Sequence, residues 1–295
     1  MAVPDTHHEA EVMDVRELTP SMRRLTLGGA GLADFRTTGL PDEWIRLFFP
    51  RAGEMHLPLP SRGRGGWEWG GEHDPEGRYY TVRSWDDSRG ELVVDIVVHG
   101  FGVATRWVQT ARRGDRLVLS SARGSFQPPT DCGWYVLVGD ITALPAIGRI
   151  IGDLPAGASA YAVVEIPADA DRQLLDTSAD LTVDWVANAG FGERSSLLEE
   201  RVRDLHLPAG AGYVWMAGEA GAARAIRRHL RHERGLTDDR HDEMGYWRVR
   251  AEEWTRRYEQ AHIDVLAIWT QGERAGRSKG DIMDEVDQTL SGAGL

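Results

Sequence analysis

Aromatic, hydroxyl and guanidinium side chains follow one another at residues 78–83, whose sequence is RYYTVR. In a strand, alternation would place Arg78 and Tyr80 on one face and Thr81 on the other. A tyrosine ring can stack on a flavin, a hydroxyl can donate to flavin N5, and an arginine can bind a pyrophosphate through paired hydrogen bonds. Taken alone, the pattern is more typical of an edge strand with exposed aromatic and charged residues.

A second pattern lies at residues 99–105, where glycines precede an expected helix at 102–111. The first N–H groups of a helix have no partners within it, so they can bind a phosphate. A simple turn from strand to helix explains these glycines equally well.

A third pattern, GDITALP, occupies residues 139–145 and follows an apolar run at 134–138. Thr142 suits a helix N-cap, and Pro145 suits a first helical turn. The Rossmann fingerprint G-x-G-x-x-G is absent from this position.

The elements that position these patterns fall into two halves. Short strands are expected at 9–18, 22–27, 44–49, 79–85, 91–98 and 115–119, with a long surface loop at 53–77, and they favour a β-barrel or sandwich. The pattern changes after QPPT at 127–130, where apolar strands begin to alternate with helical segments. The strands are expected at 134–138, 160–166, 181–186 and 212–217, and the helical segments at 144–154, just after 166, at 195–205 and at 220–236. This alternation is typical of a parallel sheet covered on both faces, which binds ligands beyond the carboxyl ends of its strands.

Composition excludes several classes of protein. A net charge of −12 argues against a general binder of nucleic acid or of anionic membranes. Cys132 is the only cysteine and Lys279 the only lysine, which excludes a disulfide, a thiolate cluster and a Schiff-base lysine in the catalytic region. The N-terminal residues show no signal-peptide pattern, and no apolar run is long enough to span a bilayer, so we expect a cytoplasmic protein without membrane insertion. We expect no metal site, because His7 and His8 are terminal, and His229 and His232 are expected to face solvent.

The order of six motifs resembles that of the siderophore-interacting protein family. The motifs are R-x-Y-T-x-R, the HG…W helix, RGSF at 123–126, GDITALPAI, AGEA at 217–220 and GYWR at 245–248. Members of this family are FAD-containing ferric-siderophore reductases of the ferredoxin–NADP reductase superfamily. The resemblance implies an antiparallel Greek-key β-barrel domain for FAD at 1–130 and a parallel-sheet α/β domain for NAD(P)H at 131–250. A C-terminal helical extension would occupy 251–295.

The resemblance also implies residue roles. Tyr80 and Thr81 would be the catalytic residues at the flavin. FAD and the nicotinamide nucleotide would contact a larger set: Arg78, Tyr80, Thr81, Val82, Arg83, His99, Gly100, Gly102, Ala104, Thr105, Asp140, Thr142, Ala143, Gly218 and Glu219. An anionic ferric siderophore would be bound by Arg46, Arg123 and Arg248, where Arg46 replaces the lysine common at its position.

Several alternatives stay open at this stage. Glu165 could bond a ribose 2′-hydroxyl and favour NADH, whereas Arg224, Arg227 and Arg228 could equally receive NADPH. Trp44 and Trp247 could contact an aromatic chelate, although a core position is the simpler interpretation. A general NAD(P)H:flavin or ferric reductase and a non-catalytic siderophore carrier are the alternative functions, and we expect a monomer.

Overall fold

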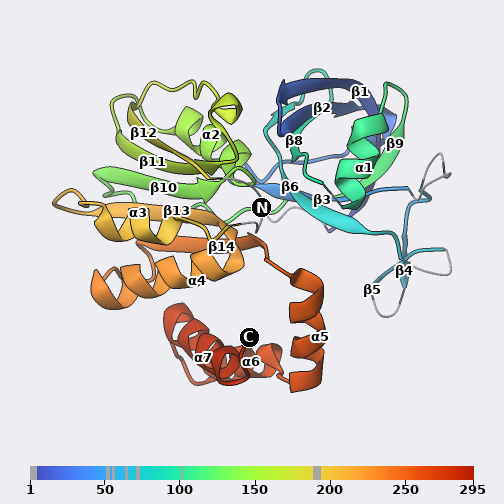
Figure 1. Ribbon diagram of the computed structural model, residues 1–295. Helices are drawn as coiled ribbons and strands as arrows, with labels where there is room; N and C mark the ends of the chain where they lie inside the picture. Colours follow the sequence, from blue (N-terminus) through green and yellow to red (C-terminus); the bar gives the residue numbers. More distant parts are fainter. Residues whose placement is uncertain are drawn as a thin grey trace.

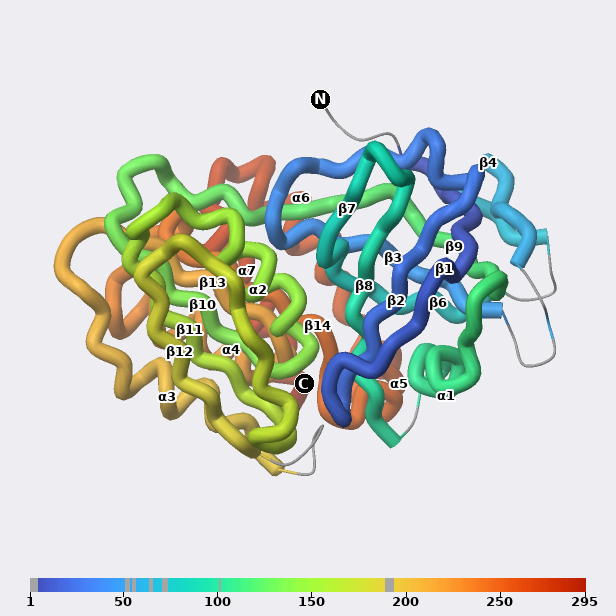
Figure 2. The backbone as a smooth tube through the Cα atoms, turned by 90° about the horizontal axis from the view of Figure 1, so that it is seen from above, coloured from blue at the N-terminus to red at the C-terminus, as the bar shows by residue number. Residues whose placement is uncertain are grey.

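The computed structural model describes residues 5–50, 54, 57–63, 66–70, 74–100, 102–188 and 194–295. Figure 1 shows two sheet domains side by side, with a group of helices below one of them. Figure 2 shows the same two domains from above, with the last helices lying beneath the parallel sheet.

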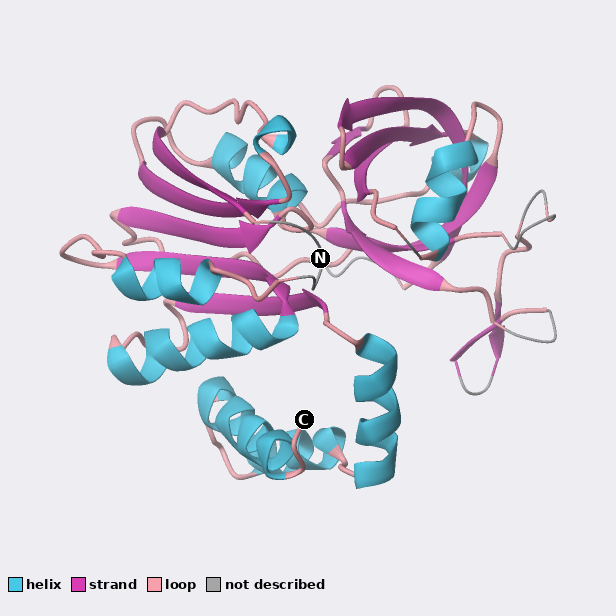
Figure 3. Ribbon diagram, in the orientation of Figure 1, coloured by secondary structure: helices cyan, strands magenta, loops and turns pink. Residues whose placement is uncertain are grey.

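The first domain is an antiparallel, barrel-like sheet in the strand order β6-β3-β9-β1-β2-β8-β7. Its strands are β1 (His7–Thr19), β2 (Met22–Gly28), β3 (Trp44–Phe48), β6 (Gly77–Thr81), β7 (Ser84–Asp86), β8 (Glu91–Val97) and β9 (Arg116–Ser120), and its helix is α1 (Val103–Thr110). Alternating residues of these strands point inward and form a core that includes Leu25, Ile45, Leu47 and Leu117. The expected barrel is therefore confirmed, with α1 lying against it in Figure 3.

Two expectations for this domain were wrong. The single strand expected at 79–85 is divided into β6 and β7, because β6 pairs with β3 whereas β7 pairs with β8. The expected loop at 53–77 contains a short hairpin of β4 (Ser61–Gly63) and β5 (Gly66–Glu68), and residues 53, 55–56, 64–65 and 71–73 of that loop lie outside the described residues.

The second domain is a five-stranded parallel sheet in the order β12-β11-β10-β13-β14. Its elements are β10 (Trp134–Asp140), α2 (Leu144–Asp153), β11 (Ser159–Ile166), β12 (Asp180–Ala187), α3 (Leu198–Asp204), β13 (Gly212–Glu219), α4 (Ala220–Arg228) with a π-helical turn at His229–Glu233, and β14 (His241–Trp247). Helix α2 covers one face, and α3 and α4 cover the other (Figure 1). The nearly continuous apolar strands follow from this two-sided burial.

Local differences from the expectations have identifiable causes. The helix expected after β11 is only a 3₁₀ turn at Asp169–Asp171, where Asp171 is used instead to accept hydrogen bonds from the Thr19 hydroxyl and from Ser21 of the barrel. The N-cap of α2 is Ala143 and not Thr142, because the Thr142 hydroxyl donates to Asp140. Pro145 does lie in the first turn of α2, as expected.

The C-terminal segment forms α5 (Ala251–Ala261), α6 (Val265–Arg274) and α7 (Lys279–Gly292). Helix α7 packs beside α4, which confirms that the tail returns to the body (Figure 1). Within the part of the chain that the structure describes, no helix is both long and apolar enough to cross a bilayer.

Candidate active site

The predicted flavin strand is β6, and its pairing with β3 shows which side chains share a face. Tyr80 lies opposite Ile45 and Arg78 opposite Leu47, and both of these partners belong to the barrel core. Arg78 and Tyr80 therefore share the inner face, as expected, but Arg78 reaches the rim and pairs with the exposed Glu76. Burial raises the pKa of Tyr80, so its hydroxyl stays neutral.

Thr81 lies on the outer face of the same strand. The register places Arg46 and Tyr79 opposite each other on that face, with the Arg46 guanidinium carbon 5.7 Å from the Tyr79 ring centroid. Arg123 follows β9 and forms a β-bridge with Trp44, two residues before Arg46. The structure thus brings Arg46, Arg123 and Thr81 to one side of the barrel.

The start of α1 fits the phosphates of a dinucleotide. Gly102, its N-cap, has φ 111°, a conformation that favours glycine, and no side chain caps the first turn. Gly100 has open space around it, and a hydroxyl at Thr105 accepts from the His99 backbone N–H at 3.4 Å. Burial lowers the pKa of His99, so its ring is neutral near pH 7. Ala104 and Thr105 are buried, and Phe101 lies outside the described residues.

One aromatic residue joins α1 to the flavin strand. The buried Phe49 ring packs edge-on against Tyr80, with 6.3 Å between centroids, and lies 5.3 Å from the Trp107 ring on α1. Phe49 therefore links the inward-facing Tyr80 to helix α1. The uncapped N–H groups at the start of α1 can bind a phosphate, and a tyrosine ring can pack against a flavin, so the residues present fit FAD.

A cavity of about 310 Å³ opens at the carboxyl ends of the parallel strands. Its lining includes Asp140 after β10, Glu165 near the end of β11, Glu219 at the end of β13 and Trp247 at the end of β14. This is where a parallel sheet binds a nucleotide. Thr142 and Ala143 follow Asp140 directly, and Ala143 is buried as the N-cap of α2.

Asp140 ties the ends of the central strands together. Its Oδ1 accepts from the Thr142 N–H at 2.8 Å and the Thr142 hydroxyl at 2.5 Å, and its Oδ2 accepts from the Glu219 N–H at 3.0 Å and Trp247 Nε1 at 2.6 Å. Burial raises the pKa of Asp140, but these donors favour the carboxylate. Gly218 is required here, because it has φ 151° and a Cβ would lie 2.6 Å from Oδ2 of Asp140.

The two domains meet at the end of the flavin strand. Burial raises the pKa of Tyr246 on β14, and Thr81 beside its hydroxyl partly opposes that rise. Arg149 on α2 donates to the fully buried Glu43 at 2.8 Å and to the carbonyl of the buried Val82 at 2.6 Å. These contacts fix Thr81 at the boundary between the barrel and the nucleotide sheet.

Arg83 and Arg248 lie on opposite sides of this boundary. The Arg83 guanidinium packs near Gly148 of α2, and burial lowers its pKa. Arg248 directly follows β14 and, within the described ranges, makes no contact with Arg46 or Arg123. The structure brings Arg46 and Arg123 together but leaves Arg248 on the sheet side.

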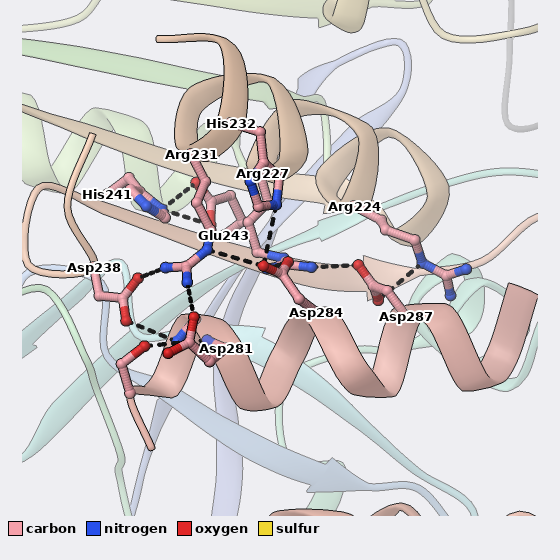
Figure 4. A network of polar contacts seen from close by, with 12 residues as sticks. Arg224, Arg227, Arg231, His232, Asp238, His241, Glu243, Asp281, Asp284 and Asp287 are labelled. Carbon is pink, nitrogen blue, oxygen red and sulfur yellow. Dashed lines mark hydrogen bonds and ion pairs between the residues drawn. The ribbon is translucent and has the colours of Figure 1, made fainter. Parts of the chain in front are cut away.

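Two of the three arginines that were alternatives for NADPH binding form ion pairs with the C-terminal helix instead, as Figure 4 shows. Arg227 is buried and pairs with Asp284 and Asp287 of α7, and Arg224 pairs with Asp287 at 3.3 Å. Arg231 extends the network to Asp281 and Asp284. This face of α4 therefore holds the C-terminal helix, and of the arginines proposed only Arg228 stays exposed.

The expectation that both histidines of this region face solvent was wrong for one of them. His229 is buried and contacts Arg203 and Arg234, whereas His232 is exposed and lies 3.1 Å from Asp284. His229 lies three residues after the buried Ile226, so helical spacing places it on the covered face of α4.

Sequence reasoning missed Glu43, Arg149 and Tyr246 at the domain boundary. Tyr246 had a usable signal, since it belongs to the GYWR motif at 245–248.

Two protein-family models match most of the chain. Residues 11–126 match the siderophore-interacting FAD-binding domain, and residues 132–250 match the siderophore-interacting protein family. The chain belongs to the siderophore-interacting protein family. The family's FAD-binding domain coincides with the barrel described above, and FAD is its cofactor.

Similar proteins with solved structures or curated names agree with this assignment. A siderophore utilization protein from T. fusca is 34% identical with a TM-score of 0.74, and the match covers 83% of this chain and 94% of that one. The NADPH-dependent ferric-chelate reductase of Escherichia coli is 26% identical over 82% of this chain and 93% of that protein. The ferric vibriobactin reductase of Vibrio cholerae is 28% identical over 83% and 90%, respectively.

Proposed function

We propose that this protein is an FAD-dependent reductase that uses NAD(P)H to reduce Fe(III) held by a siderophore, with Fe(II) released in the cytoplasm. The observation that carries the proposal is the hydrogen bond from Arg149 on α2 to the carbonyl of Val82, the residue after Thr81, because α2 begins just after Asp140 in the strand-end cavity. It brings the predicted cofactor face and the nucleotide cavity to one boundary. The named reductases among the relatives support the same activity.

The residues of this chain would bind and orient the reactants. Uncapped N–H groups at the start of α1 would hold the FAD phosphates, Tyr80 would pack against the flavin and the Thr81 hydroxyl would donate to its N5. Bound FAD would convert a two-electron hydride transfer into single-electron steps. Asp140 would hold Glu219 and Trp247 in place around the nicotinamide nucleotide.

The iron needs no protein ligand in this scheme, because oxygen chelators hold Fe(III) far more tightly than Fe(II). Arg46, Arg123 and Arg248 would attract an anionic chelate to an otherwise acidic protein. Arg46 and Arg248 make no ion pair among the described residues, and the only ion pair of Arg123 there, with Asp5, is 4.0 Å long between exposed groups. Their charges are thus available to substrate.

The spectrum of the purified protein tests the proposal. We expect bound flavin absorbance that bleaches anaerobically with NADH or NADPH and returns on addition of a ferric siderophore. Return of absorbance only with free flavins or quinones would replace the proposal by a general flavin reductase. Ferric-siderophore binding without flavin absorbance would replace it by a carrier.

Variants test the assigned roles. Tyr80→Ala should lose FAD or shift its spectrum, whereas Tyr79→Ala, at a neighbouring residue that is 67% exposed, should keep both. Joint replacement of Arg46, Arg123 and Arg248 by Gln should raise KM for an anionic chelate and spare bleaching by the nicotinamide nucleotide. An unchanged KM would remove these arginines from the substrate site.

A further inference from the structure

Helix α5 has an unusual placement for which core packing gives no reason. None of its residues is fully buried, yet it begins after Arg250 with φ 52° and ends at His262 with φ 50°. Among the described residues these are the only non-glycine positions with positive φ. A left-handed residue often ends a helix, but one at an N-cap, as at Arg250, persists only where other contacts fix the backbone.

The contact that holds α5 to the end of β14 is between a cation and an aromatic ring. The Arg248 guanidinium carbon lies 4.2 Å from the Trp254 ring centroid, and the Trp254 ring stacks on Tyr258 at 5.0 Å and 12°. Arg248 is half-buried and has no ion pair among the residues that the structure describes. A ring face orients this guanidinium without neutralising it, so its hydrogen-bond donors stay available.

The Trp254 indole keeps this position although its own N–H is left without an acceptor in the part of the chain that the structure describes. Its Nε1 is inaccessible to water and makes no hydrogen bond within the described ranges. A buried tryptophan N–H normally has a partner, because an unpaired buried donor is costly. Trp269 on α6 shows the ordinary case, with Nε1 donating to Glu273 at 2.9 Å.

We propose that Trp254 is a positioning residue of the ferric-chelate site: its ring holds the Arg248 guanidinium so that the guanidinium donates to an anionic oxygen of the ligand. The inference rests on the proposed function and names the substrate class. A cationic donor held in one orientation favours chelates with negatively charged oxygen, such as tris-catecholates, over neutral trihydroxamate complexes.

Binding of redox-inert Ga(III) complexes to the FAD-loaded protein tests this without any electron transfer. Isothermal titration calorimetry would compare a Ga(III) tris-catecholate with a neutral Ga(III) trihydroxamate. We expect Trp254→Leu to weaken the anionic complex about tenfold, Trp254→Phe to weaken it less because the ring is kept, and neither to change the neutral complex. Trp269→Phe is the matched control and should change neither.

A double-mutant cycle separates positioning from a general structural effect. In an Arg248→Gln background, Trp254→Leu should cause less than about twofold further loss, since the ring then has no cation to orient. Wild-type affinity in both Trp254 variants, or an equal loss for both complexes, would overturn the inference while the proposed function stands. If the wild-type protein binds neither complex and reduces no ferric siderophore, the proposed function fails and this inference fails with it.

Discussion

Replacement of Asp140 by asparagine tests whether one carboxylate holds the nucleotide cavity together. The two side chains have nearly the same shape, but the amide keeps only one acceptor oxygen. Whichever way the amide is oriented, its NH₂ group faces either both Thr142 donors or the donors from Glu219 and Trp247. Two hydrogen bonds to a charged acceptor are lost, at about 1.5–3 kcal/mol each.

Part of that loss is recovered, because burial already penalises the Asp140 charge and raises its pKa. We therefore expect the free energy of unfolding to fall by about 2–4 kcal/mol, measured by urea denaturation. The affinity for 5′-AMP, measured by calorimetry, should fall as well, because Trp247 and Glu219 lose their anchor. Asp153→Asn, at an exposed site on α2, should cost less than about 0.5 kcal/mol. Equal costs for the two variants would refute the role given to Asp140.

Three further changes test other parts of the structure. Gly218→Ala should cost more than about 2 kcal/mol in urea denaturation, whereas Gly276→Ala, also at positive φ but with open space, should cost about 1 kcal/mol. Arg149→Met should cost about 2–4 kcal/mol because the buried Glu43 carboxylate loses its paired cation while keeping its hydrogen bonds from Thr37 and Thr38. Adding Glu43→Gln should restore part of the loss, and additive costs would contradict the pairing. Burial opposes ionisation of Asp284, but Arg227, Arg231 and His232 outweigh it and hold its pKa below the ordinary value. The stability from this carboxylate is present above a pH of about 4 and is lost as pH falls through the lowered pKa. The hydrogen-exchange protection factors of α7, which correct for the intrinsic exchange rate at each pH, should therefore fall only in that acid range.

The sequence was sufficient for elements whose own pattern decides their structure. The apolar runs of β10 and β13 are buried on both faces, and that requirement is visible residue by residue. The division of the segment 79–85 was not visible, because it depends on a change of partner. The Val82 N–H donates to Glu43 and the Arg83 N–H donates to Val93, so the chain passes from β3 to β8 between these residues.

The site was predictable only where its residues are local. The glycine before α1 and the Asp140 turn could be located because their roles depend on a few consecutive residues. The burial of Arg227 depends on Asp284, 57 residues later, and His229 contacts Arg203, 26 residues earlier. Periodicity carries no information about such long-range partners.

Ion pairing distinguishes three arginines of the predicted motifs from the other half-buried arginines. Most half-buried arginines of the described chain are paired with carboxylates, as Arg24 is with Asp95 and Arg149 with Glu43. Arg46, Arg83 and Arg248 are the half-buried ones that have no ion pair in that part of the chain. A partly desolvated guanidinium without a carboxylate is unfavourable unless a ligand supplies the negative charge. These three were singled out by motif alone, and their unpaired charges give an independent physical reason to place the anionic cofactor and substrate beside them.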